Sequence, residues 1–378
     1  MTRYLHPDGT TVHLAYCANV HPANELPEVL AQLERYAEPI RQHLGTDRLG
    51  LGLWLAREAA TALVEDPAEL ARLRRELDAR GLEVATLNGF PYTGFGDPVV
   101  KHRVYRPDWS EAERLDYTTD LARILIELLP DDVTRGSIST LPLGWRTRPL
   151  DEPGWYDAVA RNVAALDDFL AALPRPVRVA FEPEPGCLVE STQEAVEHLG
   201  HLASEHVGLC LDACHLAVAH EDPHAALDSL TDAGISIVKL QASAALTATD
   251  PRSPETTAAL ADYAEPRFLH QTREQGGGGT DDLPEAHAEL PGDAPWRIHF
   301  HVPLHEQLPA PLGTTSDVLS QTLDALFGGP RALTDHIEAE TYTWPVMPGA
   351  DRDLASSIAG ELAWISRALT TLGLKEIR

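Results

Sequence analysis

Short apolar runs and longer amphipathic stretches alternate along the 378 residues of the chain, and this alternation restricts the folds that it can form. The apolar runs have the length and the β-branched residues of buried strands, whereas the stretches between them space apolar residues like one face of a helix. Eight strand–helix units predict an α/β fold with a parallel sheet wrapped by helices, and they fit a closed (β/α)8 barrel better than an open sheet. The predicted strands are residues 12–20, 48–55, 82–90, 136–141, 177–182, 207–212, 235–241 and 336–342. The predicted helices are residues 26–43, 67–80, 110–129, 155–173, 192–204, 223–233, 315–326 and 354–372.

The regular pattern breaks after the seventh unit. Two extra strands, at residues 268–272 and 296–302, flank a glycine run at 276–279. We expect these strands to form a hairpin over the barrel mouth with the glycines at its tip, because a phosphate-binding loop would need a strand–glycine–helix context. The prediction is one barrel domain over residues 1–378, with an insertion at 242–303 between strand seven and its helix.

The charge of the chain limits its partners. The formal net charge is −28, from 58 acidic residues against 30 lysines and arginines. Nucleic acids and anionic membrane surfaces are bound through lysine and arginine, so both are disfavoured. The N-terminal residues lack the apolar core of a signal peptide, and no apolar run reaches membrane-spanning length. We therefore expect a cytoplasmic protein without membrane insertion that acts on a small-molecule metabolite, and a homo-oligomer is compatible with the sequence.

Five apolar runs in the second half of the chain end in residues that commonly bind metal ions. The runs end in Glu182, in Asp212 with His215, in Gln241, in His299 with His301, and in Glu340. The carboxyl ends of parallel barrel strands share one rim, where active sites lie. Carboxylates, imidazoles and an amide oxygen suit a divalent ion such as Mn²⁺, Zn²⁺, Co²⁺ or Mg²⁺. All of these residues except His215 are predicted metal ligands; each could instead make only structural hydrogen bonds, as Asp212 would by capping the next turn.

A lysine accompanies this set. Side chains alternate along a strand, so Lys239 points into the barrel if Gln241 does, and Glu338 does so if Glu340 does. A buried lysine needs a partner, and we predict a contact between Lys239 and Glu338 within ~6 Å. Such a pair is either structural or takes part in proton transfer.

The first half of the chain offers groups that suit a substrate. Amide, imidazole and aromatic side chains around an ion would bind a polyhydroxylated or aromatic small molecule. The predicted substrate-binding residues are Asn19, His21, Asn88, Trp145 and His215. Lys101, Tyr105 and Trp109 lie in long loops and, with Trp145, are candidates for a lid.

The order Glu, Asp-x-x-His, polar residue, His and Glu resembles the xylose-isomerase-like TIM-barrel superfamily, which includes sugar-phosphate isomerases and epimerases and the endonuclease IV class. The resemblance implies that Glu182, Asp212, Gln241 and Glu340 bind one metal ion. It also implies that Glu182 and Glu340 exchange a proton with a substrate carbon. Gln241 stands where the epimerases have histidine, and His299 or His301 can compensate in the manner of a nuclease-type Asp-x-His.

A second resemblance covers nearly the whole chain. Segments YCANVHP (16–22), NGFPY (88–92), STLP (139–142), EPEP (182–185), LDACH (211–215), FLHQ (268–271), HFHVP (299–303) and ETYTW (340–344) are similar to the EboE "metabolite traffic" family. This resemblance implies a small secondary metabolite in an ebo-type pathway, without implying a reaction.

These observations leave three functions open. The first is a metal-dependent isomerase- or epimerase-like enzyme, or a lyase or hydrolase, with Glu182, Glu340 and Lys239 as catalytic residues. The second is a non-catalytic metabolite-binding or carrier protein on the same fold, which Gln241 slightly favours. The third, an abasic-site-type phosphodiesterase, is disfavoured by the acidic charge and by Asn88 and Ser139, which stand where that nuclease has histidines.

Overall fold

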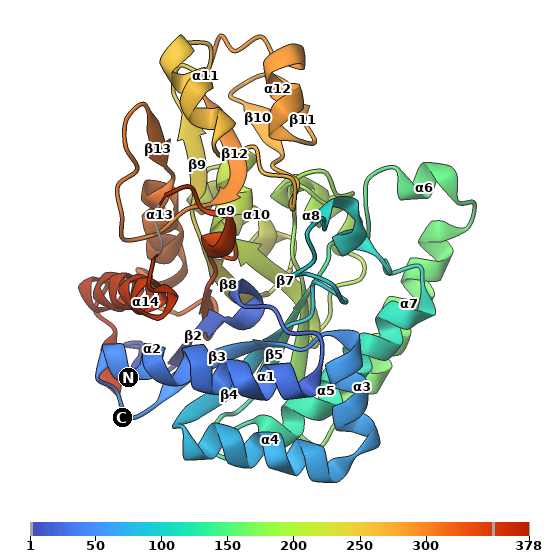
Figure 1. The fold of residues 1–378 in the computed structure, drawn as a ribbon. Helices are drawn as coiled ribbons and strands as arrows, with labels where there is room; N and C mark the ends of the chain where they lie inside the picture. The colour runs from blue at the N-terminus through green and yellow to red at the C-terminus, as the bar shows by residue number, and fades with distance from the viewer. Residues whose placement is uncertain (1–2, 350–351, 378) are drawn as a thin grey trace.

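Eight parallel strands close into a barrel, because the eighth strand hydrogen-bonds to both the seventh and the first. The computed structural model describes residues 3–349 and 352–377 (Figure 1). The predicted (β/α)8 fold is confirmed. The barrel strands are β2 (Thr11–Cys17), β3 (Leu49–Trp54), β4 (Leu82–Asn88), β5 (Gly136–Thr140), β6 (Val177–Phe181), β7 (Val207–Asp212), β8 (Ile237–Ala242) and β14 (His336–Ala339).

Helices surround the barrel and follow the predicted segments closely. They are α1 (Leu26–Gln32) and α2 (Glu38–Leu44) with a π-helical turn between them, α4 (Pro67–Ala79), α5 (Ala112–Leu128), α7 (Trp155–Ala171), α8 (Thr192–Leu199), α10 (Pro223–Asp232), α13 (Ser316–Phe327) and α14 (Leu354–Thr371). Local signals fix several ends: Ser191 and Glu194 form a capping box at the start of α8, and Asp66 caps α4. Helix α8 ends at Leu199, earlier than predicted. None of the helices in the described part of the chain could cross a membrane.

The barrel interior holds a buried ion pair. Lys239 Nζ lies 2.5 Å from Glu338 Oε2, and both side chains are 0% exposed, so the predicted contact is confirmed. Burial opposes the charge of Lys239, but Glu338 raises the pKa of this lysine above its usual value. A Cβ atom on Gly52 would lie 1.4 Å from Glu338 Oε1, so only glycine leaves room for this carboxylate.

The insertion is a larger antiparallel sheet than the predicted hairpin, and it contains the predicted antiparallel pair of strands as β10 (Thr272–Glu274) and β12 (Trp296–His301). Its five antiparallel strands are, in spatial order, β11 (Gly279–Thr280), β10, β12, β9 (Ala245–Ala248) and β13 (Leu312–Thr314). Together with α11 (Pro254–Ala261) and α12 (Leu283–Glu289), this sheet stands above the barrel (Figure 1). It reaches Thr314, beyond the predicted end at residue 303, because β13 pairs with β9.

The two ends of the chain lie side by side. Strand β1 (Arg3–Leu5) pairs with both β2 and the terminal strand β15 (Lys375–Ile377), next to the amino end of the barrel (Figure 1).

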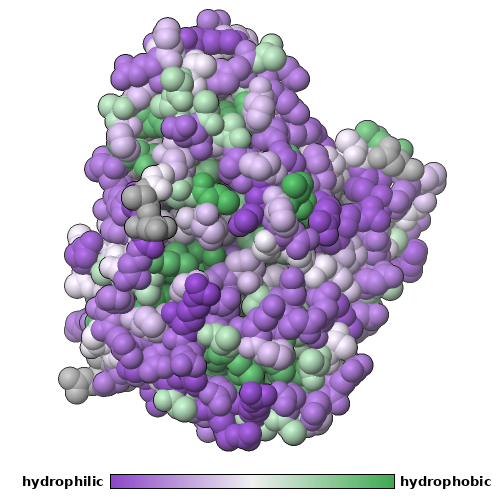
Figure 2. Space-filling view, in the orientation of Figure 1, coloured by the Kyte–Doolittle hydropathy of each residue, from purple (hydrophilic) through white to green (hydrophobic). Residues whose placement is uncertain are grey.

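Figure 2 shows a mostly hydrophilic surface, with small groups of hydrophobic residues between the insertion and the barrel. The insertion and the carboxyl ends of the strands therefore enclose the region where the predicted ligands meet.

Candidate active site

Three carboxylates from three barrel strands meet at the carboxyl end of the barrel. Glu182 follows β6, Asp212 ends β7 and Glu340 follows β14, and one oxygen of each lies within 4.8 Å of the others. Their residues are 3%, 2% and 5% exposed. Burial, and then the neighbouring carboxylates, raise the pKa of Glu182 and of Glu340 well above the usual value. The cluster is therefore unfavourable with all three groups ionised unless a cation balances them.

Asp212 and Glu340 are each fixed through one carboxylate oxygen. Asp212 Oδ1 accepts hydrogen bonds from the His215 amide, at 2.9 Å, and from the Ser243 hydroxyl, at 2.8 Å. This contact makes Asp212 the N-cap of the short helix α9 (Ala213–Val218). Glu340 Oε1 accepts from Asn19 Nδ2, at 2.6 Å, and from Asn88 Nδ2, at 3.1 Å. Asn19 and Asn88 thus orient a predicted ligand as well as lining the cavity.

Several polar atoms of this cluster are buried without a hydrogen-bond partner among the described residues. They are Glu182 Oε2, Asp212 Oδ2, His301 Nε2 and both amide atoms of Gln241. Leaving such groups unpaired costs about 1–3 kcal/mol each, so native proteins rarely tolerate several together. Gln241 stands beside Asp212 in the pairing of β8 with β7, which puts its amide at the same rim.

His301 has the arrangement of a metal-binding histidine. Its Nδ1 lies 2.7 Å from the backbone carbonyl oxygen of Glu340, and since a carbonyl only accepts, Nδ1 donates. The lone pair then resides on Nε2, and a histidine held in this way through its other nitrogen is typical of metal ligands. Burial lowers the pKa of His301 to about 4, so the ring is neutral at pH 7.

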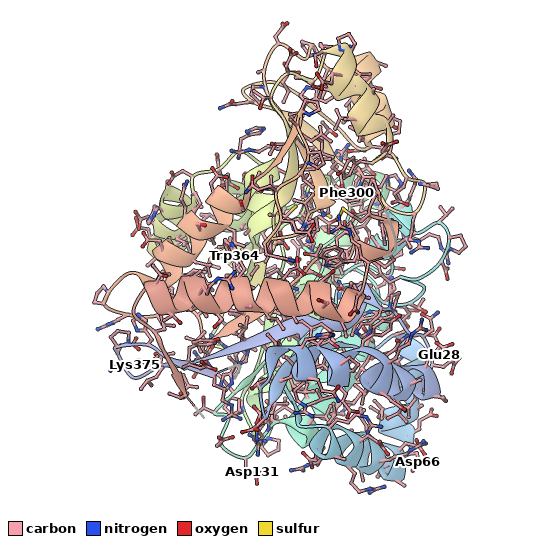
Figure 3. The ribbon with its side chains drawn as sticks, turned by 60° about the vertical axis from the view of Figure 1, so that its left-hand side comes forward. Glu28, Asp66, Asp131, Phe300, Trp364 and Lys375 are labelled. Atoms are coloured by element: carbon pink, nitrogen blue, oxygen red, sulfur yellow. The ribbon has the colours of Figure 1, made fainter. Side chains whose placement is uncertain are left out.

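His215 and His299 face each other through nitrogens that both carry lone pairs. His215 Nδ1 donates to the carbonyl oxygen of Pro183, at 2.7 Å, and His299 Nδ1 donates to Gln271 Oε1, at 2.7 Å. Their Nε2 atoms are 3.1 Å apart, a contact that is favourable only with a shared proton or a cation. Asp212, His215 and His301 form a second group of atoms that could hold a cation. Figure 3 places Phe300, between the two histidines of β12, at the base of the insertion.

The structure gathers most of the predicted residues and leaves three aside. Nine of them meet at this rim: Asn19, Asn88, Glu182, Asp212, His215, Gln241, His299, His301 and Glu340. His21, Trp145 and Lys239 do not line the cavity. The His21 ring contacts the Tyr16 hydroxyl and stacks on the Tyr36 ring with centroids 4.7 Å apart. The Trp145 ring packs against that of the cavity residue Tyr105, with centroids 4.7 Å apart.

Sequence reasoning missed Glu184 and Gln271 as members of the site. Glu184 lines the cavity, and its Oε1 accepts a hydrogen bond of 2.6 Å from the Tyr105 hydroxyl. Burial raises the pKa of Glu184 to about 7. A signal existed, because Glu184 follows Glu182 by two residues. Of the lid candidates, Lys101 and Tyr105 line the cavity, whereas Trp109 is buried against Phe181.

The cavity above the carboxylates is small. Its volume is about 50 Å³, and loops from the barrel and the insertion cover it. A larger cavity of about 510 Å³ lies at the opposite, amino end of the barrel. Most of the charged groups there already pair with one another, as Arg3 and Arg48 do with Glu83. We therefore place the candidate active site at the carboxyl end.

Solved structures share the fold over nearly the whole chain. L-ribulose 3-epimerase superposes with a TM-score of 0.52 at 14% identity, covering 98% of this chain and 96% of that one. A xylose isomerase-like TIM barrel protein from Mycobacterium smegmatis in complex with magnesium gives 0.53 at 13% identity, covering 97% and 93%. D-psicose 3-epimerase from Clostridium cellulolyticum H10, with D-tagatose, gives 0.50 at 14%, covering 94% and 98%.

At these identities the structural likeness shows the fold alone. No curated protein matches the chain. The family model described as xylose isomerase-like TIM barrel matches residues 45–290. Because this match spans more than half of the chain, the protein belongs to the xylose isomerase-like TIM barrel family.

Proposed function

We propose that the protein is a metal-dependent enzyme of the isomerase or epimerase type, which moves a proton at a carbon next to a carbonyl or hydroxyl group of a small metabolite. The observation that carries the proposal is the buried cluster of Glu182, Asp212 and Glu340, whose ligand atoms lie within 4.8 Å of one another. Two structures with the same fold are those of epimerases, and a third contains magnesium, which supports this choice.

The residues present fit a divalent cation. Glu182, Asp212, Gln241 and Glu340 would hold it, with His301 as a further ligand through its unpartnered Nε2. Oxygen ligands with one imidazole suit Mn²⁺, Zn²⁺, Co²⁺ or Mg²⁺, and His299 beside His215 extends the set toward the softer of these ions. When bound, the ion would polarise a substrate oxygen and so acidify the adjacent C–H bond.

Glu182 and Glu340 are the proposed proton-transfer groups. In the strand order of the barrel, β7 and β8 separate β6 from β14, so the two carboxylates approach the cavity from different sides. One can therefore accept a proton from one face of a carbon while the other donates to the opposite face. Lys239 does not line the cavity, and we assign it a positioning role, in which its charge lowers the pKa of both carboxyl groups.

The remaining predicted residues receive supporting roles in this proposal. Asn19, Asn88 and His215 contact the substrate, while His21 and Trp145 support residues around the cavity. The similarity of segments such as 88–92 and 340–344 to the EboE family favours a secondary metabolite of an ebo-type pathway as the substrate. We also propose that residues 1–378 act as one domain, with the insertion covering the mouth.

Proton exchange tests the proposed activity. The metal-loaded protein in D₂O should catalyse loss of the α-C–H signal of small hydroxyketones, followed by proton NMR. Glu182→Gln and Glu340→Gln should abolish this exchange. Glu83→Gln, which changes a buried carboxylate at the other end of the barrel, should retain it. Equal exchange in the two site variants and the wild type would reject the assigned roles.

A carrier function is the second candidate. Gln241 favours it, because an amide binds a metal ion less strongly than the histidine of the related epimerases would. A carrier would bind the cation and a metabolite without exchanging any substrate proton, so the same NMR experiment separates the two functions.

A further inference from the structure

The cavity over the carboxylates has a polar floor and an apolar roof. The floor consists of the strand ends with their carboxylates, amides and imidazoles. Phe95 and Val104 from the loop after β4, Phe268 and Leu269 from the insertion, and Tyr342 after β14 form the roof. The two faces therefore present opposite chemistry to whatever lies between them.

Three aromatic rings make up the centre of the roof. The Phe95 ring lies 5.1 Å from that of Phe268 and 5.5 Å from that of Tyr342, and the last two are 4.9 Å apart. All three residues are buried, and together with Trp54, Ala56 and Val100 they form a hydrophobic cluster separate from the main core. The cluster therefore connects the barrel loops with the insertion along this part of the cavity.

The polar groups along the roof already have partners. The Tyr105 hydroxyl donates to Glu184 and accepts from Gln271, and Lys101 pairs with Asp282. Hydroxyl groups on the part of a substrate beneath the roof would therefore be buried unpaired, which weakens binding. An apolar body in the same place would gain affinity by leaving water.

The roof has to move to admit a substrate of the size of a sugar or an aromatic ketone. The cavity of about 50 Å³ has room for only a few water molecules. Phe95 stands between Gly94, with a φ of +65°, and Gly96, and glycines adopt backbone conformations that are closed to other residues. The loop is attached to the insertion by the Val100 and Lys101 amides, which donate to the carbonyl oxygen of Arg267 at 2.7 and 3.0 Å. Closure would return the same rings to the substrate.

We propose that the substrate has two parts: an oxygenated head, with adjacent hydroxyl and carbonyl groups, and a flat apolar body that lies under Phe95, Phe268 and Tyr342. The head reaches the carboxylate cluster, and the body fills the space that opens when the roof moves. This inference rests on the proposed function for the role of the head. The predicted substrate class differs from the sugars named for the epimerases of similar fold, because part of the substrate is apolar.

Two probes with the same head and different bodies test the inference. α-Hydroxyacetophenone carries a phenyl ring on the hydroxyketone group, and dihydroxyacetone carries a second hydroxymethyl group in its place. Calorimetric titrations, with and without Mn²⁺, should give at least about tenfold tighter binding of α-hydroxyacetophenone. Equal affinities, or tighter binding of dihydroxyacetone, would overturn the inference. If the preference persists but Mn²⁺ neither binds nor strengthens it, this inference stands and the proposed function fails.

Roof variants locate the preference. Phe95→Ser and Phe268→Ser should each reduce the ratio of the two affinities to near unity, whereas Phe95→Leu, which keeps an apolar side chain, should retain it. Thermal melting of each variant checks that the variant is folded. If one serine variant does not fold, the other serine variant and the leucine variant still decide the test. A ratio that is unchanged in folded serine variants would contradict the assignment of the body to this roof.

Discussion

At the scale of residues, Asp212 has two functions that a single substitution can separate: it caps a helix, and it supplies a negative charge to the carboxylate cluster. Its Oδ1 caps helix α9 and accepts from Ser243, while Oδ2 has no partner among the described residues. Asparagine can keep the first function through its own Oδ1 but cannot supply a negative charge. Three buried carboxylates within 4.8 Å also oppose one another without a cation, so the site is a source of instability in the metal-free protein.

Lys239 and Glu338 allow a prediction about the barrel interior. Lys239→Met would leave the Glu338 charge buried and unpaired, which we expect to lower the free energy of unfolding by about 3 kcal/mol. The double variant Lys239→Met/Glu338→Gln should recover most of this loss, because no buried charge is left alone. Urea denaturation of the three proteins measures both effects. A double variant as unstable as the single one would show that the pair does more than balance charge.

The sequence did not predict the side-chain directions of residues that lie outside regular strands and helices. Lys239 and Glu338 were predictable because alternation along a strand fixes which side chains share the interior. His21 lies beyond the end of β2, in irregular backbone, and its ring turns toward Tyr36 and not toward the cavity. Glu184 likewise follows the strand β6, and its partner Tyr105 comes from a loop whose path no local pattern specifies.

At the scale of elements, the barrel and the insertion strand β12 were predictable, whereas most of the insertion was not. Each barrel strand is an apolar run followed by a helix of clear periodicity, which the eight repeats reinforce. The insertion strands β9, β10, β11 and β13 have two to four residues. Strands of this length are too short to show an alternation of apolar and polar residues in the sequence. Helices α3 (Arg57–Glu65) and α9 were missed because each begins within three residues of the end of a strand, in a segment expected to be a loop.

The insertion is joined to the barrel by a charged pair that can be tested. Arg273 on β10 contacts Glu190, which precedes α8, with Nη2 2.7 Å from Oε2. Arg273→Met should speed amide hydrogen exchange in residues 272–301 by about tenfold while the barrel strands keep their protection. Mass spectrometry of exchanged peptides measures this change. Arg72→Met, which removes an exposed pair within α4, is the control and should alter neither region.

At the scale of the whole molecule, buried neutral histidines set the response to acid. Burial lowers the pKa of His21 to about 4 and that of His336 to about 3, below the usual value of 6.5. The unfolded chain therefore binds protons at these sites between pH 6.5 and 4, where the folded chain does not. Stability is retained above pH 6.5 and is lost as the pH falls, by about 1.4 kcal/mol per pH unit for each such histidine.

Urea denaturation of the metal-free protein between pH 7 and pH 5 checks this prediction. His336→Gln should reduce the pH dependence of the unfolding free energy by about one proton per molecule, because glutamine does not titrate. A slope identical to that of the wild type would mean that His336 is not a neutral buried group. The result does not depend on the candidate active site, since His336 does not line the cavity.

The metal content of the purified protein shows whether the carboxylate rim binds a divalent cation. The protein is loaded with Mn²⁺, passed into metal-free buffer and analysed by atomic emission, with thermal melting in chelator as the check on folding. We expect at least about one tightly held ion per wild-type chain and none in Asp212→Asn. We also expect Asp212→Asn to melt no lower than the wild type in chelator, since the variant removes one of three carboxylates that repel one another. A wild-type protein that retains no cation, or an Asp212→Asn variant that retains as much as the wild type, would show that the carboxylate rim is not a metal site.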